Sequence, residues 1–310
     1  MAKTTGSRKK KELSGKKKTQ LVYNALMLPS VICLILFSYV PMFGIVMAFQ
    51  NFTPVKGVFG SEFVGLKNFV RLFTMQNVQQ VIRNTLFIAI SKIILDIVVP
   101  VTFALLLNEV RNTSFVRVVQ TITYLPYFLS WVILSGVFIE IFSPSGGLVN
   151  NILGAFNIDP IFFLGDKKWF PHIIIWTDTW KNFGFSAIIY LAALTSIDPS
   201  LYEAARVDGA NHFQQVIHIT LPGISTIVIL MTVLSIGGIL DAGFDQVFNM
   251  YNPLVYETGD VLDTFVYRLG IKDMSFSLSV AVDLLKSVVS LVLILTSYKM
   301  ADKFAGYSVF

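Results

Sequence analysis

Cysteine, histidine and charged residues are all scarce in this 310-residue chain. Cys33 is the only cysteine, which excludes a disulfide framework and a cysteine-based metal site. The three histidines (His172, His212 and His218) lack a metal-site spacing with nearby acids or thiols, so we interpret them as structural. Charged residues make up 14% of the chain, compared with about 25% in ordinary soluble domains. The composition therefore indicates that most of the chain has lipid as its solvent.

Motifs for nucleotide hydrolysis and nucleophilic catalysis are also missing. The phosphate loop, Gly-x-x-x-x-Gly-Lys-Ser/Thr, does not occur in the sequence. No nucleophile and base stand in a catalytic arrangement. We therefore expect that the chain is not an enzyme and that it holds neither a metal nor a cofactor of its own.

Six apolar segments are long enough to cross a bilayer, which takes about 20 residues in a helix. Hydrophobic residues make up 54% of the chain, and its mean hydropathy is +0.68. Backbone that faces lipid must satisfy its own hydrogen bonds, so each segment is expected to be a helix. The sequence predicts an all-α, polytopic membrane protein with six transmembrane helices, at residues 23–48, 84–107, 118–142, 170–194, 222–240 and 276–298.

The N-terminal segment is strongly basic, with eight Lys or Arg residues and one Glu within residues 1–20. Lys and Arg accumulate on the cytosolic side of membrane proteins, so we interpret this segment as a topology signal rather than a nucleic-acid-binding tail. An inside N-terminus places thirteen Lys or Arg residues on the cytosolic side and eight on the other. We therefore predict a cytosolic tail over 1–20, a membrane domain over 21–310, both termini in the cytosol, and a cytosolic loop over 195–221.

Capping signals divide this loop into two short helices. Asp198 can accept the free amides of a first helical turn, and Pro199 fits its first position. Gly209 is placed to end this helix in the left-handed conformation. Asn211 and Gln214 have the spacing of a capping box, which starts a second helix. The second helix carries an apolar stripe that is expected to be buried and consists of Phe213, Val216, Ile217 and Thr220.

One motif runs through this loop: Glu203-Ala204-Ala205, three residues, Gly209, nine residues, and then Ile219-x-Leu221-Pro222. It resembles the EAA motif of permease subunits in binding-protein-dependent ABC importers, and all seven positions match. Pro222 also suits the opening of the fifth span. Further segments are similar to the carbohydrate-uptake branch of that family, to its polysaccharide/lipoprotein permease group and to maltose-type permeases. They are Tyr39-Val40-Pro41, Phe63-Val64-Gly65-Leu66-Lys67-Asn68-Phe69, Tyr124-Leu125-Pro126, Trp180-Lys181 and Tyr190-Leu191-Ala192-Ala193-Leu194.

The resemblance implies a fold, a mechanism and partners. The implied fold is that of a type I ABC importer permease (MetI-like), with the permease domain over residues 21–310. The 198–222 loop would sit in a cleft of a cytosolic ATPase. The implied contact residues are Glu203, Ala204, Ala205 and Gly209, with Ile219, Leu221 and Pro222 connecting them to the fifth span.

The implied cargo is a carbohydrate, most simply an oligosaccharide, that crosses the cell membrane inward. The implied partners are a second homologous permease, two ATPase subunits that bind ATP and Mg, and an extracellular or periplasmic substrate-binding protein. Three long connections outside the membrane, at 49–83, 143–169 and 241–275, either dock this binding protein or simply cap the bundle.

Ionisable residues inside spans are costly and usually face the bundle interior. Three pairs lie three or four residues apart and can share one helix face: Lys92 with Asp96, Asp178 with Lys181, and Asp283 with Lys286. For the first and third pairs we favour pairing within or between helices over contact with the cargo.

The fourth span combines aromatic and hydrogen-bonding residues. Flat aromatic faces suit the apolar C–H face of a sugar ring, whose hydroxyls need polar partners. Trp residues near span ends can equally anchor a helix at the membrane interface. The predicted substrate path consists of Trp176, Asp178, Trp180 and Asn182, together with Asp241, Asp245 and Gln246 near the outer end of the fifth span.

Two other classes of protein are compatible with six spans. A secondary transporter or channel subunit would use the intramembrane charges for ion coupling or conduction. A membrane-anchored assembly protein would need no transport path.

Overall fold

The computed structural model describes residues 5–305, with side chains described for residues 17–300 and for Asp302. Residues 1–4 of the predicted tail and residues 306–310 of the predicted membrane domain lie outside the described residues. The described part of the tail is helical, since α1 begins at Thr5.

The described chain is mostly helical, which confirms the all-α prediction. Its longer helices are α1 (Thr5–Leu34), α5 (Gln76–Asn108), α9 (Trp169–Leu194), α12 (Leu221–Ile236) and α16 (Phe276–Ala305). The shorter ones are α2 (Val40–Met42), α3 (Gly57–Gly60), α4 (Lys67–Thr74), α6 (Thr113–Tyr124), α7 (Trp131–Ile141), α8 (Leu148–Ala155), α10 (Pro199–Val207), α11 (His212–Gln215), α13 (Phe244–Met250), α14 (Tyr256–Gly259) and α15 (Leu262–Tyr267). Two short strands, β1 (Gln50–Asn51) and β2 (Glu62–Phe63), pair antiparallel.

Up to six membrane spans fit the described helices. Four continuous stretches are long and apolar enough, namely Lys17–Phe49, Gln76–Asn108, His212–Ile236 and Phe276–Met300. Two bent pairs bring the number to six when each is counted as one span. These pairs are Thr113–Phe128 with Trp131–Ile141, bent by 104°, and Trp169–Leu194 with Pro199–Val207, bent by 70°.

The predicted third span, 118–142, is not one straight helix. A 3₁₀ turn, η3 (Leu125–Phe128), follows α6, and α7 then starts in a new direction with Ser130 as its N-cap. The buried Lys181 ammonium on α9 donates to the Tyr127 carbonyl at 2.9 Å. A cation at the end of a helical segment satisfies carbonyls that have no partner within the segment, so Lys181 stabilises the break.

A π-helical segment precedes a proline at two places in the chain. These are η1 (Ile35–Tyr39), before Pro41, and η4 (Val216–Thr220), before Pro222. Proline lacks an N–H and its ring clashes with the carbonyl four residues earlier, and a wider turn relieves both problems. Pro222 therefore lies inside a continuous helical stretch, His212–Ile236, instead of opening a separate span at residue 222 as predicted.

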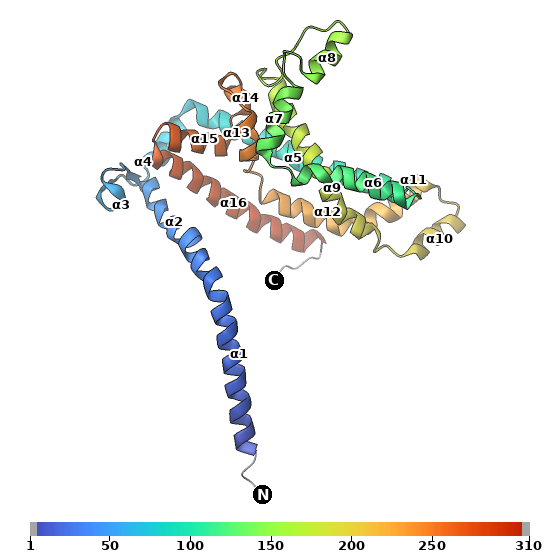
Figure 1. Ribbon diagram of the computed structural model, residues 1–310, viewed down its shortest axis with the longest axis horizontal. Coiled ribbons are helices and arrows are strands. Elements are labelled where there is room, and N and C mark those ends of the chain that lie inside the picture. The colour runs from blue at the N-terminus through green and yellow to red at the C-terminus, as the bar shows by residue number, and fades with distance from the viewer. Residues whose placement is uncertain (1–4, 306–310) are drawn as a thin grey trace.

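The helix α1 projects away from the rest of the molecule, whereas α5, α9, α12 and α16 pack side by side in the body (Figure 1). Only 6% of the most apolar 18-residue stretch of the first span is buried by the rest of the chain. One core cluster joins α5, α9 and α13 through Ile88, Ile174 and Val247, and another joins α9 to α12 through Tyr190 and Ile224. The arm formed by α1 thus depends on lipid or on another protein to cover its apolar surface.

Candidate functional site

The helix α10 begins as its capping residues predict. The Asp198 carboxylate accepts the Ser200 N–H at 2.9 Å, and Pro199 occupies the first helical position. Hydrogen bonds from Ser200 hold the pKa of the Asp198 carboxyl below its usual range. The start of α10 is therefore fixed at Pro199, and residues 196–198 separate it from Thr195, the C-cap of α9.

The end of α10 is a glycine turn of the Schellman type. Gly209 has φ of +80°. The Ala210 N–H donates to the Ala205 carbonyl at 2.9 Å, and the Gly209 N–H donates to the Arg206 carbonyl at 3.2 Å. These are the two hydrogen bonds that define this motif, in which only glycine adopts the left-handed position cheaply. The predicted helix stop at Gly209 is confirmed.

The capping box at the start of α11 is also confirmed. The Asn211 side chain accepts the Gln214 N–H at 2.9 Å, and the Gln214 side chain accepts the Asn211 N–H at 2.8 Å. The helix then continues through η4 into α12 without a break. The second helix of the loop is thus the first part of the fifth span.

The predicted apolar stripe is only partly buried. Thr220 is buried, but Phe213 is 72% exposed and Ile217 is exposed as well. The prediction of a buried stripe is therefore wrong for Phe213 and Ile217, whose side chains the rest of this chain leaves exposed. Val207, at the end of α10, is 88% exposed. The loop consequently presents apolar side chains on its outer side, where another protein can cover them.

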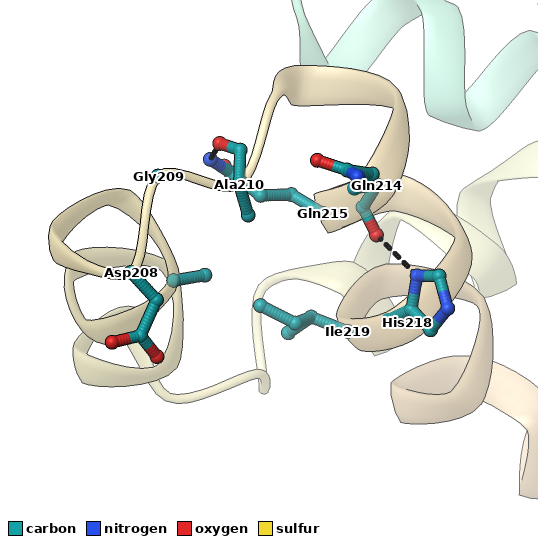
Figure 2. Close-up of a pocket in the computed structure, with 8 residues that line it drawn as sticks. Asp208, Gly209, Ala210, Gln214, Gln215, His218 and Ile219 are labelled. Atoms are coloured by element: carbon teal, nitrogen blue, oxygen red, sulfur yellow. Dashed lines mark hydrogen bonds between the residues drawn. The ribbon is translucent and has the colours of Figure 1, made fainter.

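A groove lies between α10 on one side and α11 with η4 on the other (Figure 2). It encloses about 360 Å³ and is lined by Ala205, Asp208, Gly209, Ala210, Gln214, Gln215, His218 and Ile219. Three residues of the predicted contact set thus meet in one groove. The other four lie outside it on exposed surface: Glu203 and Ala204 on α10, and Leu221 and Pro222 at the start of α12.

Two contacts that the sequence did not indicate hold the loop in place. The Tyr202 hydroxyl on α10 lies 3.0 Å from the Thr220 hydroxyl on η4. Nε2 of His212 lies 3.1 Å from a carboxylate oxygen of Glu109, which follows α5. Both contacts join segments that carry no mutual sequence signal, so spacing alone could not have found them.

Replacing Asn211 with alanine is expected to weaken the start of α11. The substitution removes the acceptor of the Gln214 N–H, and loss of such a cap costs about 1 kcal/mol. Hydrogen exchange of the α11 amides in the purified protein should be several-fold faster. Asn211→Asp keeps an acceptor and should exchange like the natural chain, and equal rates in both variants would count against this role of the cap.

A buried polar network joins α5, α9 and α13. The Lys92 ammonium donates to Gln246 Oε1 at 2.6 Å and to the Ala242 carbonyl at 2.8 Å, and lies 3.4 Å from an Asp178 carboxylate oxygen. The Gln246 amide donates to the Ile174 carbonyl and to the Thr177 hydroxyl, both at 2.8 Å. The network holds two residues of the predicted substrate path in the interior.

The three predicted charge pairs within single helices do not form among the described ion pairs. Lys92 pairs with Asp178 instead of Asp96, and Lys286 pairs with Asp263 on α15 instead of Asp283. Lys181 bonds to the Tyr127 carbonyl instead of Asp178. In each case a partner from a neighbouring element lies closer than the one on the same helix. Pairing between helices, one of the two arrangements favoured above, is therefore the one the structure contains.

The remaining predicted path residues are accessible to different degrees. Trp176 is 58% exposed and Trp180 is 46% exposed, and both lie on α9. Asn182 is half-buried, and Asp241 and Asp245 are exposed. Asp178 and Gln246, at 9% and 0% exposure, are instead occupied by the network around Lys92.

The two ends of α9 define the class of protein. Its 26 residues rise about 39 Å, more than the roughly 30 Å of a hydrocarbon core. The helix is therefore long enough to cross a membrane, and α10 and α11 lie together at one end of the molecule (Figure 1). Residues 198–222, called the docking loop below, expose the apolar side chains of Val207, Phe213 and Ile217. A helical membrane protein with such a loop and without a phosphate loop of its own is typical of a transporter subunit that a partner energises.

Comparison with known proteins identifies the family. Residues 96–298 match the family described as "binding-protein-dependent transport system inner membrane component", and the chain belongs to this family. It is 41% identical over 302 residues to the polygalacturonan/rhamnogalacturonan transport system permease protein YteP of Bacillus subtilis (strain 168), covering 97% of this chain and 94% of that protein. It is 38% identical over 279 residues to Protein LplB of the same strain, covering 90% and 88%.

The fold is also similar to that of a solved structure. The crystal structure of a bacterial ABC transporter involved in the import of the acidic polysaccharide alginate contains a chain with a TM-score of 0.86 and 37% identity. The match covers 94% of this chain and 99% of that chain. The predicted family and permease fold are confirmed. Family membership rules out the alternatives of a secondary transporter, a channel subunit and an assembly protein. It also assigns the chain to a membrane component of a transport system, which is not itself an enzyme.

Proposed function

We propose that the chain forms part of the translocation path of an ABC importer for a carbohydrate, most simply an oligosaccharide. The observation that carries this proposal is the 37% identity, over 94% of the chain, to a subunit of the alginate transporter. The names of relatives agree, since they include polygalacturonan/rhamnogalacturonan and lactose transport permeases. The accessible Trp176 and Trp180 are the path residues best suited to stack on sugar rings.

The loop at 198–222 is the proposed site of coupling to a partner ATPase. Glu203, Ala204, Ala205 and Gly209 would make the contact, and Ile219, Leu221 and Pro222 would connect it to α12. Support comes from the exposed apolar side chains of the loop and from its rigid glycine turn. ATP and Mg would bind to two ATPase subunits, on the side of the membrane that also holds both termini.

The remaining partners would be a second permease and an external binding protein. The exposed apolar arm α1 supports a second membrane subunit, because such a surface needs a cover. An alginate transporter similar to this chain was crystallised with a periplasmic protein that holds an alginate pentasaccharide, which supports a binding protein.

Replacing Gly209 with valine tests the coupling assignment. A β-carbon at this position would meet nothing within 4 Å, so the substitution acts through φ alone. A left-handed β-branched residue costs on the order of 2 kcal/mol, which favours a displaced α10. ATP-driven uptake by the reconstituted complex should fall about tenfold or more. Gly209→Asn, which tolerates the left-handed region, should retain most of the uptake.

The assay uses liposomes that hold the assembled importer with its ATPases and binding protein. Both variants should assemble as the natural chain does, as size-exclusion chromatography would show. Full uptake by the assembled valine variant would disprove the coupling role of the turn.

A further inference from the structure

A second groove lies at the end of the molecule opposite the docking loop. It encloses about 400 Å³ between the N-terminal turns of α5, the N-terminus of α9, and α14. Its framework is fixed by main-chain contacts. The Glu257 carbonyl accepts hydrogen bonds from the Gln80 amide at 2.6 Å and from the Asn84 amide at 3.0 Å, and the Thr258 hydroxyl donates to the Lys167 carbonyl at 2.7 Å.

The side chains that line this groove are predominantly basic, so we call it the basic groove. Arg83, Lys167 and Lys168 carry three positive charges, and Glu257 carries the one negative charge of the lining. Glu257 pairs with Lys167. Arg83 and Lys168 are exposed and form no ion pair with any described residue. Asp166, just outside the lining, accepts the Lys168 N–H at 2.7 Å and the Trp169 N–H at 3.4 Å. Two free cations therefore face the groove.

An aromatic stripe leads from the basic groove along α9. His172 lines the groove and packs edge-on against Phe87 of α5, with ring centroids 6.1 Å apart. Trp176 and Trp180 follow at intervals of four residues, which place them on the same face of the helix, and both are exposed. The groove thus opens onto the path residues proposed above.

We propose that the basic groove binds the carboxylates of an acidic, uronate-bearing oligosaccharide as it enters the path. This inference rests on the proposed function, since it takes the cargo to be a carbohydrate. Arg83 and Lys168 pair with the carboxylates, and the stripe at Trp176 and Trp180 receives the apolar faces of the sugar rings. Guanidinium and ammonium groups recognise carboxylates through charge-assisted hydrogen bonds, which a neutral sugar cannot form.

The combination of groove and stripe favours a carbohydrate over an anionic lipid. A lipid headgroup also carries negative charge, but its acyl chains need an aliphatic surface. The stripe of α9 below the groove presents His172, Trp176 and Trp180, whose rings combine flat apolar faces with N–H groups. This pairing of an apolar face with a polar edge matches a sugar ring.

The test is ATP-driven uptake by the complete importer in liposomes of zwitterionic lipid. The probes are an oligogalacturonide and the same oligosaccharide after chemical reduction of its carboxyls, each presented on the binding protein. The variant Arg83→Gln/Lys168→Gln removes both free cations. Arg117→Gln/Lys299→Gln removes two exposed cations on α6 and α16, outside the three long connections, and serves as the matched control.

Uptake of the acidic probe below saturation should fall about tenfold in the groove variant, because the variant loses both exposed charge contacts with the carboxylates. The deficit should shrink at high salt. Uptake of the neutral probe, and of both probes by the control variant, should change less than twofold. If the binding protein holds only the acidic probe, the groove variant and the control are compared on that probe and across salt concentrations.

Several results would overturn the inference. Equal losses for both probes would make the groove a structural or docking element. A loss that appears only when anionic lipid is added would make it a lipid site, and a binding protein that holds only neutral sugars would exclude the acidic cargo. If the importer takes up a neutral sugar and the groove variant has no effect, this inference fails and the proposed function stands. If the importer with the natural chain takes up no carbohydrate, the proposed function fails.

Discussion

Replacing Gly184 with valine should prevent the protein from folding. A β-carbon at Gly184 would lie 2.2 Å from the carbonyl oxygen of Thr123 and 2.6 Å from its carbonyl carbon. These are backbone atoms of α6, so no flexible side chain can move away. Overpacking of this kind costs about 3 kcal/mol or more. The yield of monodisperse protein after size-exclusion chromatography in detergent should fall to near zero.

Alanine variants make this prediction quantitative. Gly184→Ala places the same β-carbon against Thr123 and should lower the thermal unfolding midpoint. Gly136, on α7, has nothing within 4 Å of an added β-carbon. Gly136→Ala should therefore leave the midpoint unchanged or raise it, because alanine favours helices by up to about 1 kcal/mol over glycine. Matching midpoints for the two alanine variants would show that α6 and α9 do not approach each other as described.

Replacing Asp178 with asparagine should destabilise the protein by about 3–5 kcal/mol, since it removes the carboxylate that forms the described ion pair with the buried Lys92. Asparagine keeps the shape of the side chain, so the loss measures charge rather than packing. The double variant Lys92→Met/Asp178→Asn removes both charges and should recover much of this loss. Thermal unfolding in detergent, arranged as a double-mutant cycle, measures the coupling between the two positions.

The control for this pair is Asp159→Asn, which removes an exposed carboxylate that forms no ion pair with the described residues. Its effect should lie within about 0.5 kcal/mol. Additive effects of the Lys92 and Asp178 substitutions would contradict a direct interaction between them.

Local chemistry made the docking loop predictable from sequence. Caps and glycine turns satisfy the amides and carbonyls of residues only a few positions away. The hydrogen bonds of Asp198, Asn211 and Gln214, and the left-handed Gly209, therefore follow from spacing alone.

Long-range pairing was not predictable in the same way. The spacing of Lys92 and Asp96 shows that they share a helix face, but it carries no information on what packs against that face. The partner that Lys92 finds, Asp178, lies on another helix, and Gln246 reaches the same site from α13. Only the packing of α5 against α9 and α13 brings these residues together.

The bend in the third span is marked in the sequence by a proline and a helix cap, which a hydropathy average over the span does not detect. A window of apolar residues measures length and composition, and both are satisfied on either side of the break. Pro126 and Ser130 mark the turn and the new helix start, and the buried Lys181 completes it from α9. The exposure of Phe213 was missed for a different reason, because an amphipathic pattern shows that a stripe needs a cover without showing which chain supplies it.

The unbroken helix from His212 to Ile236 makes the docking loop one end of a rigid lever. Its 25 residues rise about 38 Å, so a tilt of about 5° around one end moves the other by about 3 Å. The π turn η4 lies within this stretch, and its Thr220 hydroxyl contacts the Tyr202 hydroxyl of α10. In the proposed coupling, a partner that displaces α11 would therefore tilt α12 in the same movement, because both belong to one helical stretch.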